Sequence, residues 1–321
     1  MTATVTVDVA GGQAGGAARF RDELYSYLAR TGRSDVQVIG ARRRVVPSWL
    51  VRRELSIAGR TRRVAVNSVG FAAPGGERWT LLRNALHFLT SQEEAELDPS
   101  LRTAIQRKAR MVRLMASRAD VLVTPSTAMA ERVAATLPSV ARHLVVRMHP
   151  VSPGLIPAGP RDQTILCPVL FESYKDMTER IGELAAAITE IGDRDVRLLV
   201  TADRGEVPPD LATHPRVDFV GRLSYPVLCR LWARSRAIYF PPGLESFGYP
   251  LAEARVSGHC VIARDTAQNR EIAGPALRGF SLGDRNSLRE ATSLALSTHV
   301  RPDPAPFDPD AYFGWLLGSR S

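Results

Sequence analysis

The stretch AIYFPPGLESFGYPLAEARVSGHCVIARDTAQNREIAG, residues Ala237–Gly274, decides the fold. Its pattern predicts a strand, a loop and a helix, and then the same three elements again. Residues 237–240 are apolar and β-prone, and Pro241–Gly243 stops the strand and opens a loop. Pro250 begins the first helix, because its missing N–H is not needed in a first helical turn. The stretch therefore predicts an α/β unit with a loop at the carboxyl end of a strand.

The start of that helix is suited to an anion. The backbone N–H groups of Leu251, Ala252 and Glu253 have no partner in a predicted first turn and can point at a phosphate. Glu245 lies in the loop, eight positions before Glu253, so one carboxylate can reach beyond the phosphate while the other stays beside it. The alternative is a βαβ unit in which one acid is a loop carboxylate and the other a favourable charge near the helix N-terminus.

The run Glu245–Glu253, followed by Gly258–Ile262 and Glu271–Gly274, resembles the E-x7-E signature of retaining glycosyltransferases of family 4, which have the GT-B fold. The resemblance implies an α/β protein with two Rossmann-like α/β/α domains that face each other across a cleft. It also implies that Glu245 lies under the donor sugar, that Glu253 binds the nucleotide ribose and that the amides between them hold the diphosphate. The similarity is dense over about residues 164–290 and thin over residues 1–152.

A glycine-rich loop near the N-terminus is a further candidate. Thr4–Ala10 alternate as a first strand, and Gly11, Gly12, Gly15 and Gly16 precede a predicted helix. These glycines do not fit the dinucleotide fingerprint G-x-G-x-x-G. The resemblance places the loop against the donor diphosphate or the acceptor, and glycine suits such a close approach of the backbone. A flexible turn is the alternative.

The apolar run Trp79–Leu86 predicts a buried strand that ends beside Asn84 and His87. Ligands of open α/β sheets bind beyond the carboxyl ends of the strands. The resemblance gives His87 a place near the sugar and its acceptor, and Asn84 lies at the same predicted strand end. A histidine satisfied by the core is the alternative. At a strand end, the imidazole is expected to change its charge between about pH 5 and 8.

Lys175 precedes a predicted helix over residues 176–191 and matches the diphosphate-binding lysine of the family, with a plain surface lysine as the alternative. Leu170 replaces the family's companion arginine, and Arg180 or Arg222 is a candidate substitute. The resemblance thus nominates catalytic, nucleotide-binding and substrate-binding residues. In that order, they are Glu245 and His87; Lys175, Phe247, Gly248, Tyr249, Leu251, Ala252, Glu253, Gly15 and Gly16; and Asn84 and Arg222.

Length and proline content predict the domain division. A chain of 321 residues, 45% of them hydrophobic, can bury two cores, since a domain holds roughly 150 residues. Prolines at 150, 153, 157 and 160 mark the linker. We expect an N-terminal Rossmann-like acceptor-binding domain at 1–152 and a nucleotide-sugar-binding domain at 160–300. The resemblance implies that the tail at 301–321 carries a helix that crosses back to the first domain.

Cysteine usage and the N-terminus predict the compartment. The three cysteines are odd in number, widely spaced and set in apolar surroundings, which is typical of reduced core thiols. No basic leader with an apolar core, and no apolar run of membrane-spanning length, is visible. We therefore expect a cytoplasmic protein. Peripheral association with the inner face of a membrane is left open.

The net charge of +9 is concentrated in the first half, where residues 1–152 hold 23 Lys and Arg against 12 Asp and Glu. Eight arginines, with Glu54 as the only acid among them, lie between residues 42 and 63. Apolar residues such as Trp49, Val51 and Leu55 are interleaved with them, so a basic amphipathic element that touches a membrane or an anionic acceptor is one interpretation. A solvated face is the other. The arginines are Arg42, Arg43, Arg44, Arg52, Arg53, Arg60, Arg62 and Arg63.

These patterns favour a glycosyltransferase that moves a sugar from a nucleoside diphosphate sugar to an acceptor hydroxyl, in glycan, glycolipid or natural-product biosynthesis. The resemblance implies retention of configuration and no metal, and the six histidines show no ligand spacing. No separate cofactor is expected. The alternatives are a GT-B sugar-nucleotide epimerase and a non-enzymatic binder of anionic polymer or membrane through residues 42–63, although no nucleic-acid motif is visible.

Overall fold

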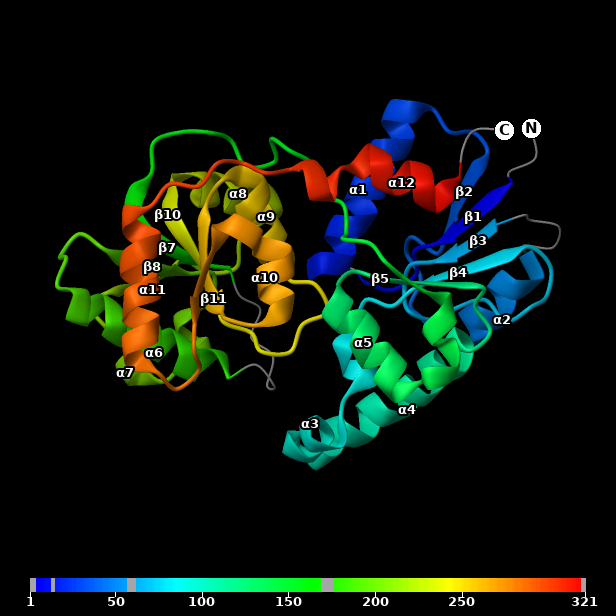
Figure 1. Ribbon diagram of the computed structural model, residues 1–321, viewed down its shortest axis with the longest axis horizontal. Helices are drawn as coiled ribbons and strands as arrows, with labels where there is room; N and C mark the ends of the chain where they lie inside the picture. Colours follow the sequence, from blue (N-terminus) through cyan, green and yellow to red (C-terminus); the bar gives the residue numbers. More distant parts are fainter. Residues whose placement is uncertain (1–3, 13–14, 57–61, 169–175, 319–321) are drawn as a thin grey trace. The chain divides into compact units, whose positions relative to one another are not determined.

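A computed structural model describes residues 4–12, 15–56, 62–168 and 176–318 of the chain. The chain forms two compact units. Unit 1 comprises residues 1–150, 245–247 and 307–321, and unit 2 comprises residues 151–244 and 248–306. Each unit contains a six-stranded sheet (Figure 1). The division between Pro150 and Val151 falls at the start of the proline-rich stretch.

The sheet of unit 1 is parallel throughout, in the order β2-β1-β3-β4-β5-β6. Val7 pairs with Val38 on one side and with Val64 on the other. Short apolar runs suit strands that are covered on both faces. The strands are β1 (Val5–Asp8), β2 (Val36–Ile39), β3 (Arg62–Ala65), β4 (Glu77–Leu81), β5 (Val121–Thr124) and β6 (Leu144–Val146).

Helix α12 completes unit 1 from the far end of the sequence. Its Phe313 ring lies 5.5 Å from Phe20 and 5.3 Å from Tyr27, both on α1. The Arg62 side chain donates to the carbonyl of Leu316 at 3.1 Å. The helices of this unit are α1 (Gly15–Thr31), α2 (Pro47–Ser56), η1 (Ala85–Phe88), α3 (Ser91–Glu96), α4 (Pro99–Ala116), α5 (Thr127–Thr136), η2 (Pro138–His143) and α12 (Pro309–Leu317), and η5 (Ala305–Phe307) leads into the last of them.

Unit 2 also has a parallel sheet, in the order β12-β11-β10-β7-β8-β9. The strands are β7 (Asp162–Cys167), β8 (Arg197–Val200), β9 (Val217–Phe219), β10 (Ser235–Phe240), β11 (Cys260–Arg264) and β12 (Leu277–Phe280). The helices are α6 (Met177–Ile191), η3 (Arg204–Glu206), α7 (Pro209–Ala212), α8 (Tyr225–Arg234), α9 (Tyr249–Ser257), α10 (Ala267–Ala273), η4 (Gly274–Ala276) and α11 (Arg285–Ser297).

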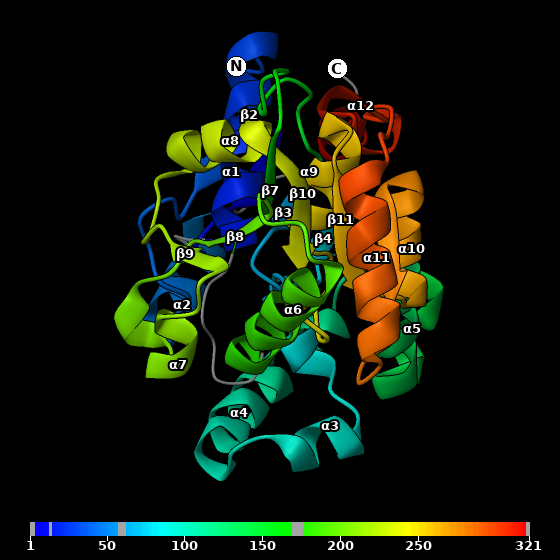
Figure 2. The same ribbon diagram turned by 90° about the vertical axis from the view of Figure 1, so that its left-hand side faces the viewer.

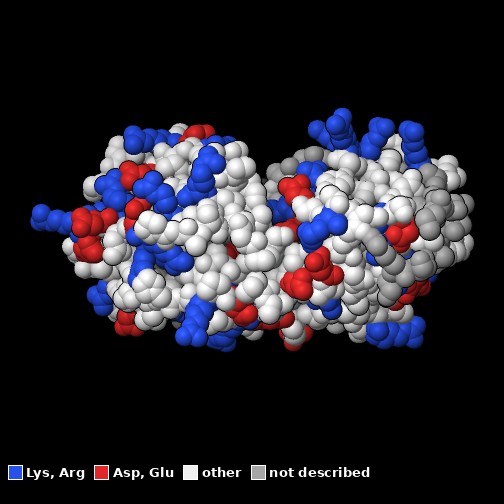
Figure 3. All heavy atoms as spheres, turned by 90° about the horizontal axis from the view of Figure 1, so that it is seen from above, with Lys and Arg blue, Asp and Glu red and all other residues white. Residues whose placement is uncertain are grey.

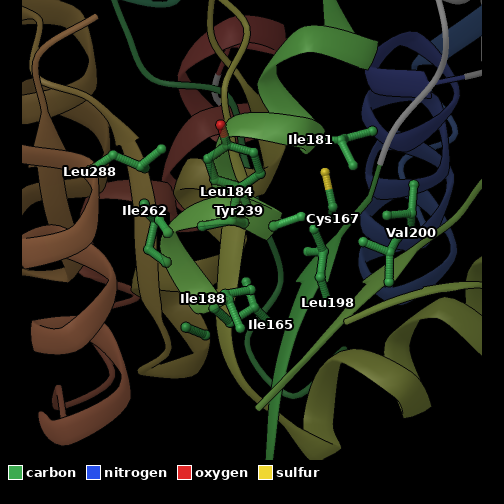
Figure 4. Close-up of a cluster of buried hydrophobic side chains, with 14 of the residues drawn as sticks. Ile165, Cys167, Ile181, Leu184, Ile188, Leu198, Val200, Tyr239, Ile262 and Leu288 are labelled. Carbon is green, nitrogen blue, oxygen red and sulfur yellow. The ribbon is translucent and has the colours of Figure 1, made fainter. Parts of the chain in front are cut away.

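The alternation of strand side chains divides the core of unit 2 into two layers. Ile165 and Cys167 of β7 lie with Tyr239 of β10 in a cluster that α6 and α11 cover (Figure 4). The two helices lie side by side in both ribbon views (Figures 1 and 2). Leu166 and Ile238, one position out of phase, are also fully buried. They face the opposite layer, because successive strand side chains point to opposite faces.

Candidate active site

The loop after β10 leaves the sheet of unit 2 at its topological switch point. Strand β7 comes first in this unit, and its neighbours β8 and β10 lie on opposite sides of it. Ligands of open α/β sheets bind beyond the carboxyl ends of the strands at such a point. Strand β10 ends at Phe240, so the loop that begins at Pro241 and leads into α9 starts at this position.

Gly248 shapes the turn into α9. Its φ is +80°, in the left-handed region. An added Cβ would lie 2.9 Å from a ring carbon of Phe240 and 3.0 Å from Leu251 Cδ1. The Leu251 N–H donates to the Gly248 carbonyl at 2.9 Å. This bond corrects the expectation that the Leu251 amide is free, since the turn itself already uses it.

Glu253 lies on α9 with only 2% of its surface exposed. Its Oε1 accepts a hydrogen bond from the Tyr225 hydroxyl at 3.2 Å. Tyr225 is the first residue of α8, so the starts of two helices hold this carboxylate. Tyr249 and Ala252 are buried on the same helix.

Residues Glu245–Phe247 belong to unit 1, whereas Gly248–Glu253 belong to unit 2. Ser246 Oγ donates to the Arg83 carbonyl at 2.7 Å, and Ser126 Oγ donates to the Ser246 carbonyl at 3.2 Å. The Phe247 ring lies 5.1 Å from that of His149. Two hydrogen bonds and an aromatic contact therefore hold this short segment within unit 1, where Glu245 is half-buried.

Arg83 joins three candidate segments that the sequence treats separately. Its Nη2 donates to the Gly16 carbonyl at 3.0 Å, and its guanidinium lies 4.5 Å from the centroid of the Phe20 ring. Its own carbonyl accepts the bond from Ser246. Gly15 starts α1 with φ +59°, which glycine adopts readily. The glycine loop, the turn at Asn84 and the segment 245–247 thus share one arginine, which the sequence reading did not select. In the sequence, the only indication of a role for Arg83 is its position next to Asn84.

Asn84 and His87 do not end a strand, which corrects the predicted strand Trp79–Leu86. Strand β4 ends at Leu81, and Asn84 caps η1 by accepting the Leu86 N–H on Oδ1 at 3.0 Å. The apolar run continues into η1 because its side chains pack inward as well. Hydrophobic pattern alone does not separate these two cases.

His87 is 4% exposed, and its Nδ1 has no hydrogen-bond partner among the residues that the structure describes. Burial lowers the pKa of His87 to about 4, and the charges of Lys108 and Arg113 add to the shift. The imidazole is therefore neutral at neutral pH. The expected change of charge near physiological pH moves to lower pH, because desolvation disfavours the charged form.

The structure gives less information on the cations that are expected to bind the diphosphate. Lys175 and Leu170 lie outside the described residues. Arg222 follows β9, is 63% exposed in its side chain and pairs with Glu206. Arg180 on α6 holds both carboxylate oxygens of Glu183 at 2.8 Å. Both candidate substitutes, Arg180 and Arg222, therefore already have an acidic partner. Over the part of the chain that is described, no three His, Cys, Asp or Glu side chains form a metal-binding group.

The arginines between residues 42 and 63 do not form one exposed face. Arg53 and Arg63 are buried, and Arg62 pairs with Glu77, while Arg60 lies outside the described residues. The remaining four, Arg42–Arg44 and Arg52, are exposed. Figure 3 shows basic and acidic side chains interspersed over much of one face. None of the helices in the described ranges is long and apolar enough to cross a membrane.

Sequence comparison finds no family model and no curated protein that matches this chain. Solved structures do match it. Sucrose-phosphate synthase from Thermosynechococcus elongatus aligns with a TM-score of 0.64 at 16% identity, over 98% of this chain and 94% of that one. WaaG, a glycosyltransferase involved in lipopolysaccharide biosynthesis, aligns at 0.66 and 14% identity, over 98% and 100%. HepE from Anabaena, solved in complex with UDP, aligns at 0.62 and 13% identity, over 98% and 95%.

The chain has the GT-B fold. The strand order in unit 2 is that of the dinucleotide-binding Rossmann sheet, with β7 in the place of its first strand. Unit 1 differs, because β1 lies between β2 and β3. At these identities the likeness establishes the GT-B fold, and the assignment of an activity depends on the residues described above.

Proposed function

We propose that the protein is a glycosyltransferase that moves a sugar from a nucleoside diphosphate sugar to an acceptor hydroxyl. The observation that carries the proposal is that β10 ends beside β7, at the switch point of the sheet in unit 2, and that Gly248–Glu253 lead into α9 of the same unit. The UDP bound to HepE, which has the same fold, supports a nucleotide donor.

The residues of unit 2 suggest how the nucleotide is held. Gly248 lets the backbone approach a diphosphate closely, and the N-terminus of α9 favours its negative charge. Glu253 accepts a hydrogen bond from the Tyr225 hydroxyl, and in the proposal it accepts hydrogen bonds from the ribose hydroxyls in the same way. Lys175 contributes the cation, as the resemblance implies. Glu245 is assigned to the sugar.

The proposed reaction breaks the bond between the anomeric carbon and the diphosphate oxygen and forms one from that carbon to the acceptor oxygen. The departing diphosphate takes the acceptor's proton on the same face, so configuration is retained. Stabilising the leaving diphosphate requires positive charge and amide donors that are placed before the reaction begins. Neither a metal ion nor a separate cofactor enters this scheme.

The experiment measures nucleotide binding by thermal stabilisation with UDP, GDP and dTDP, since a ligand that binds only the folded state raises the melting temperature. Glu253→Gln should weaken binding by about ten- to a hundredfold, the range for a lost charge-assisted hydrogen bond. Glu290→Gln is the matched control, because Glu290 is an exposed glutamate on α11 of the same unit.

Lys175 can be tested by chemical modification, because Lys108 and Lys175 are the only lysines in the chain. An amine-reactive reagent followed by peptide mass analysis should show that nucleotide protects Lys175 and leaves Lys108 reactive. Equal labelling with and without nucleotide would remove Lys175 from the site. If none of the three nucleotides stabilises the protein, the proposed function is wrong. Conversion of a sugar nucleotide without an acceptor would indicate an epimerase instead.

A further inference from the structure

Helix α2 is inverted relative to an ordinary surface helix. Its charged residue Arg53 is fully buried, whereas Val51 and Leu55 on the opposite side are 62% and 79% exposed. Val46, just before the helix, is 41% exposed. Val51 and Leu55 are four positions apart, so they lie on one face of the helix with Arg52 next to them. A surface helix normally turns its apolar side inward.

The inner contacts fix this orientation. Arg53 Nη1 donates to Asp8 Oδ2 at 2.6 Å, and its Nη2 donates to the Val69 carbonyl at 2.9 Å. The two carboxylate oxygens of Glu54 accept the N–H groups of Ala72 and Ala73 at 2.9 and 3.0 Å. Turning α2 to bury Val51 and Leu55 would leave the carboxylate of Asp8 without its guanidinium partner. The exposure of the apolar residues is therefore a stable property of the fold.

Unpaired cations lie within this helix and just before it in the chain. Arg42–Arg44 precede the helix and Arg52 lies within it, and all four are exposed. None of them has a side-chain partner among the described residues. Glu54 is the only acid between residues 40 and 56, and its carboxylate is turned towards backbone amides. The backbone of this basic segment is also held, because the Arg43 carbonyl accepts the Gly11 N–H at 2.8 Å.

We propose that the outer face of α2, made of Val51, Arg52 and Leu55 together with Arg42–Arg44, docks on an anionic lipid surface. Exposed apolar side chains beside arginines match the acyl boundary and the phosphate headgroups of such a surface. A second copy of the chain would bring two sets of unpaired arginines together. This inference goes beyond the proposed function, because it concerns where the protein binds and not the reaction.

The test is sedimentation of the full chain with phosphatidylcholine vesicles, with and without phosphatidylglycerol. Only the anionic vesicles should bind the protein, and added salt should weaken binding because it screens surface charge. Arg42→Ser, Arg43→Ser and Arg44→Ser together should lower vesicle affinity by about a hundredfold. The matched control is Arg107→Ser, Arg110→Ser and Arg118→Ser, which removes three exposed arginines from the same unit.

A second pair of variants tests the apolar part. Val51→Gln with Leu55→Gln should lower vesicle affinity at least about tenfold, because two exposed apolar side chains no longer enter the lipid. Leu114→Gln on α4, which is 55% exposed, is the control and should leave affinity unchanged. Glutamine keeps a high helix propensity, and circular dichroism verifies folding. Only vesicle affinity is measured for these variants, so the outcome is independent of nucleotide binding.

Three results would overturn the proposal. One is that the unmodified protein does not bind anionic vesicles at low salt. Another is that the two triple arginine variants lose the same affinity, or that the control variant loses more. The last is that light scattering shows a dimer which the Val51→Gln and Leu55→Gln changes dissociate, since the face would then bind a second copy.

Discussion

Replacing Arg53 with Met tests the buried ion pair that holds α2 in place. Arg53 has 1% of its side chain exposed and Asp8 has none. The guanidinium donates to Asp8 at 2.6 Å and lies 4.3 Å from the centroid of the Phe71 ring. Methionine keeps the apolar stem and removes every donor. Among the residues that the structure describes, Asp8 then retains the Asn67 amide at 3.1 Å and the Ala10 N–H at 3.0 Å.

Removal of one partner from a buried ion pair costs about 3–5 kcal/mol, because the other charge stays buried without its counter-charge. Two donors remain on Asp8, so we expect about 3 kcal/mol, near the lower limit of that range. Urea unfolding followed by tryptophan fluorescence measures this change, since Trp49, Trp79 and Trp315 all belong to unit 1. With an m-value of about 1–3 kcal/mol per M, the midpoint should fall by roughly 1–3 M.

Arg52→Met is the matched control, because Arg52 is the neighbouring residue on the same helix and is exposed. It should change the free energy of unfolding by no more than about 0.5 kcal/mol. The double variant Asp8→Asn with Arg53→Met should lose less than the sum of the two single variants, since it leaves no buried charge. Equal losses for Arg52→Met and Arg53→Met would refute the view that this pair holds the helix.

Two further predictions follow from His87 and Gly248. The unfolded pKa of a histidine is about 6.5, and that of folded His87 is about 4, so between these values only the unfolded state binds the proton. Stability should therefore fall by about 3 kcal/mol as pH drops through this window. The urea midpoint of His87→Gln should depend less steeply on pH than that of the unmodified protein. Equal slopes would contradict the burial of a neutral imidazole. Gly248→Ala should cost about 1–2 kcal/mol in stability and weaken nucleotide binding. The control Gly192→Ala, at φ +79° with no atom within 4 Å of the added Cβ, should cost less and leave nucleotide binding intact. Equal costs would mean that the contact of the added Cβ with Phe240 does not limit stability.

Local sequence signals were sufficient for the elements around the candidate site in unit 2. The predicted strand at 237–240 lies within β10, which starts two residues earlier, and the helix predicted at Pro250 begins one residue earlier. Both succeeded because Pro241–Gly243 ends the strand and proline is favourable in a first helical turn. The α/β architecture of both units follows from the alternation of such elements.

The interpretation failed where a side chain depends on a distant partner. Both interpretations of the arginine cluster, an element that touches a membrane or an anionic acceptor and a solvated face, leave Arg53 exposed, because arginine is rarely buried without a partner. Its partner Asp8 lies 45 positions earlier in the chain, and the contact exists only once β1 and β3 pair side by side. Likewise, Ser246 contacts Arg83 across 163 positions. No local pattern reports such distances, so the role of Arg83 was missed.

The arginine-rich composition illustrates why net charge does not measure a binding surface. All but two of the 42 basic residues are arginines. A guanidinium presents several donors in a plane, so one side chain can serve two carbonyls at once, which an ammonium group on a flexible stem does less well. Arg63 donates to the carbonyls of Ala73 and Pro74, and Arg53 and Arg83 use their forks in the same way. Much of the positive charge of unit 1 is therefore structural, and an anionic partner is left mainly with the arginines that have no such bonds.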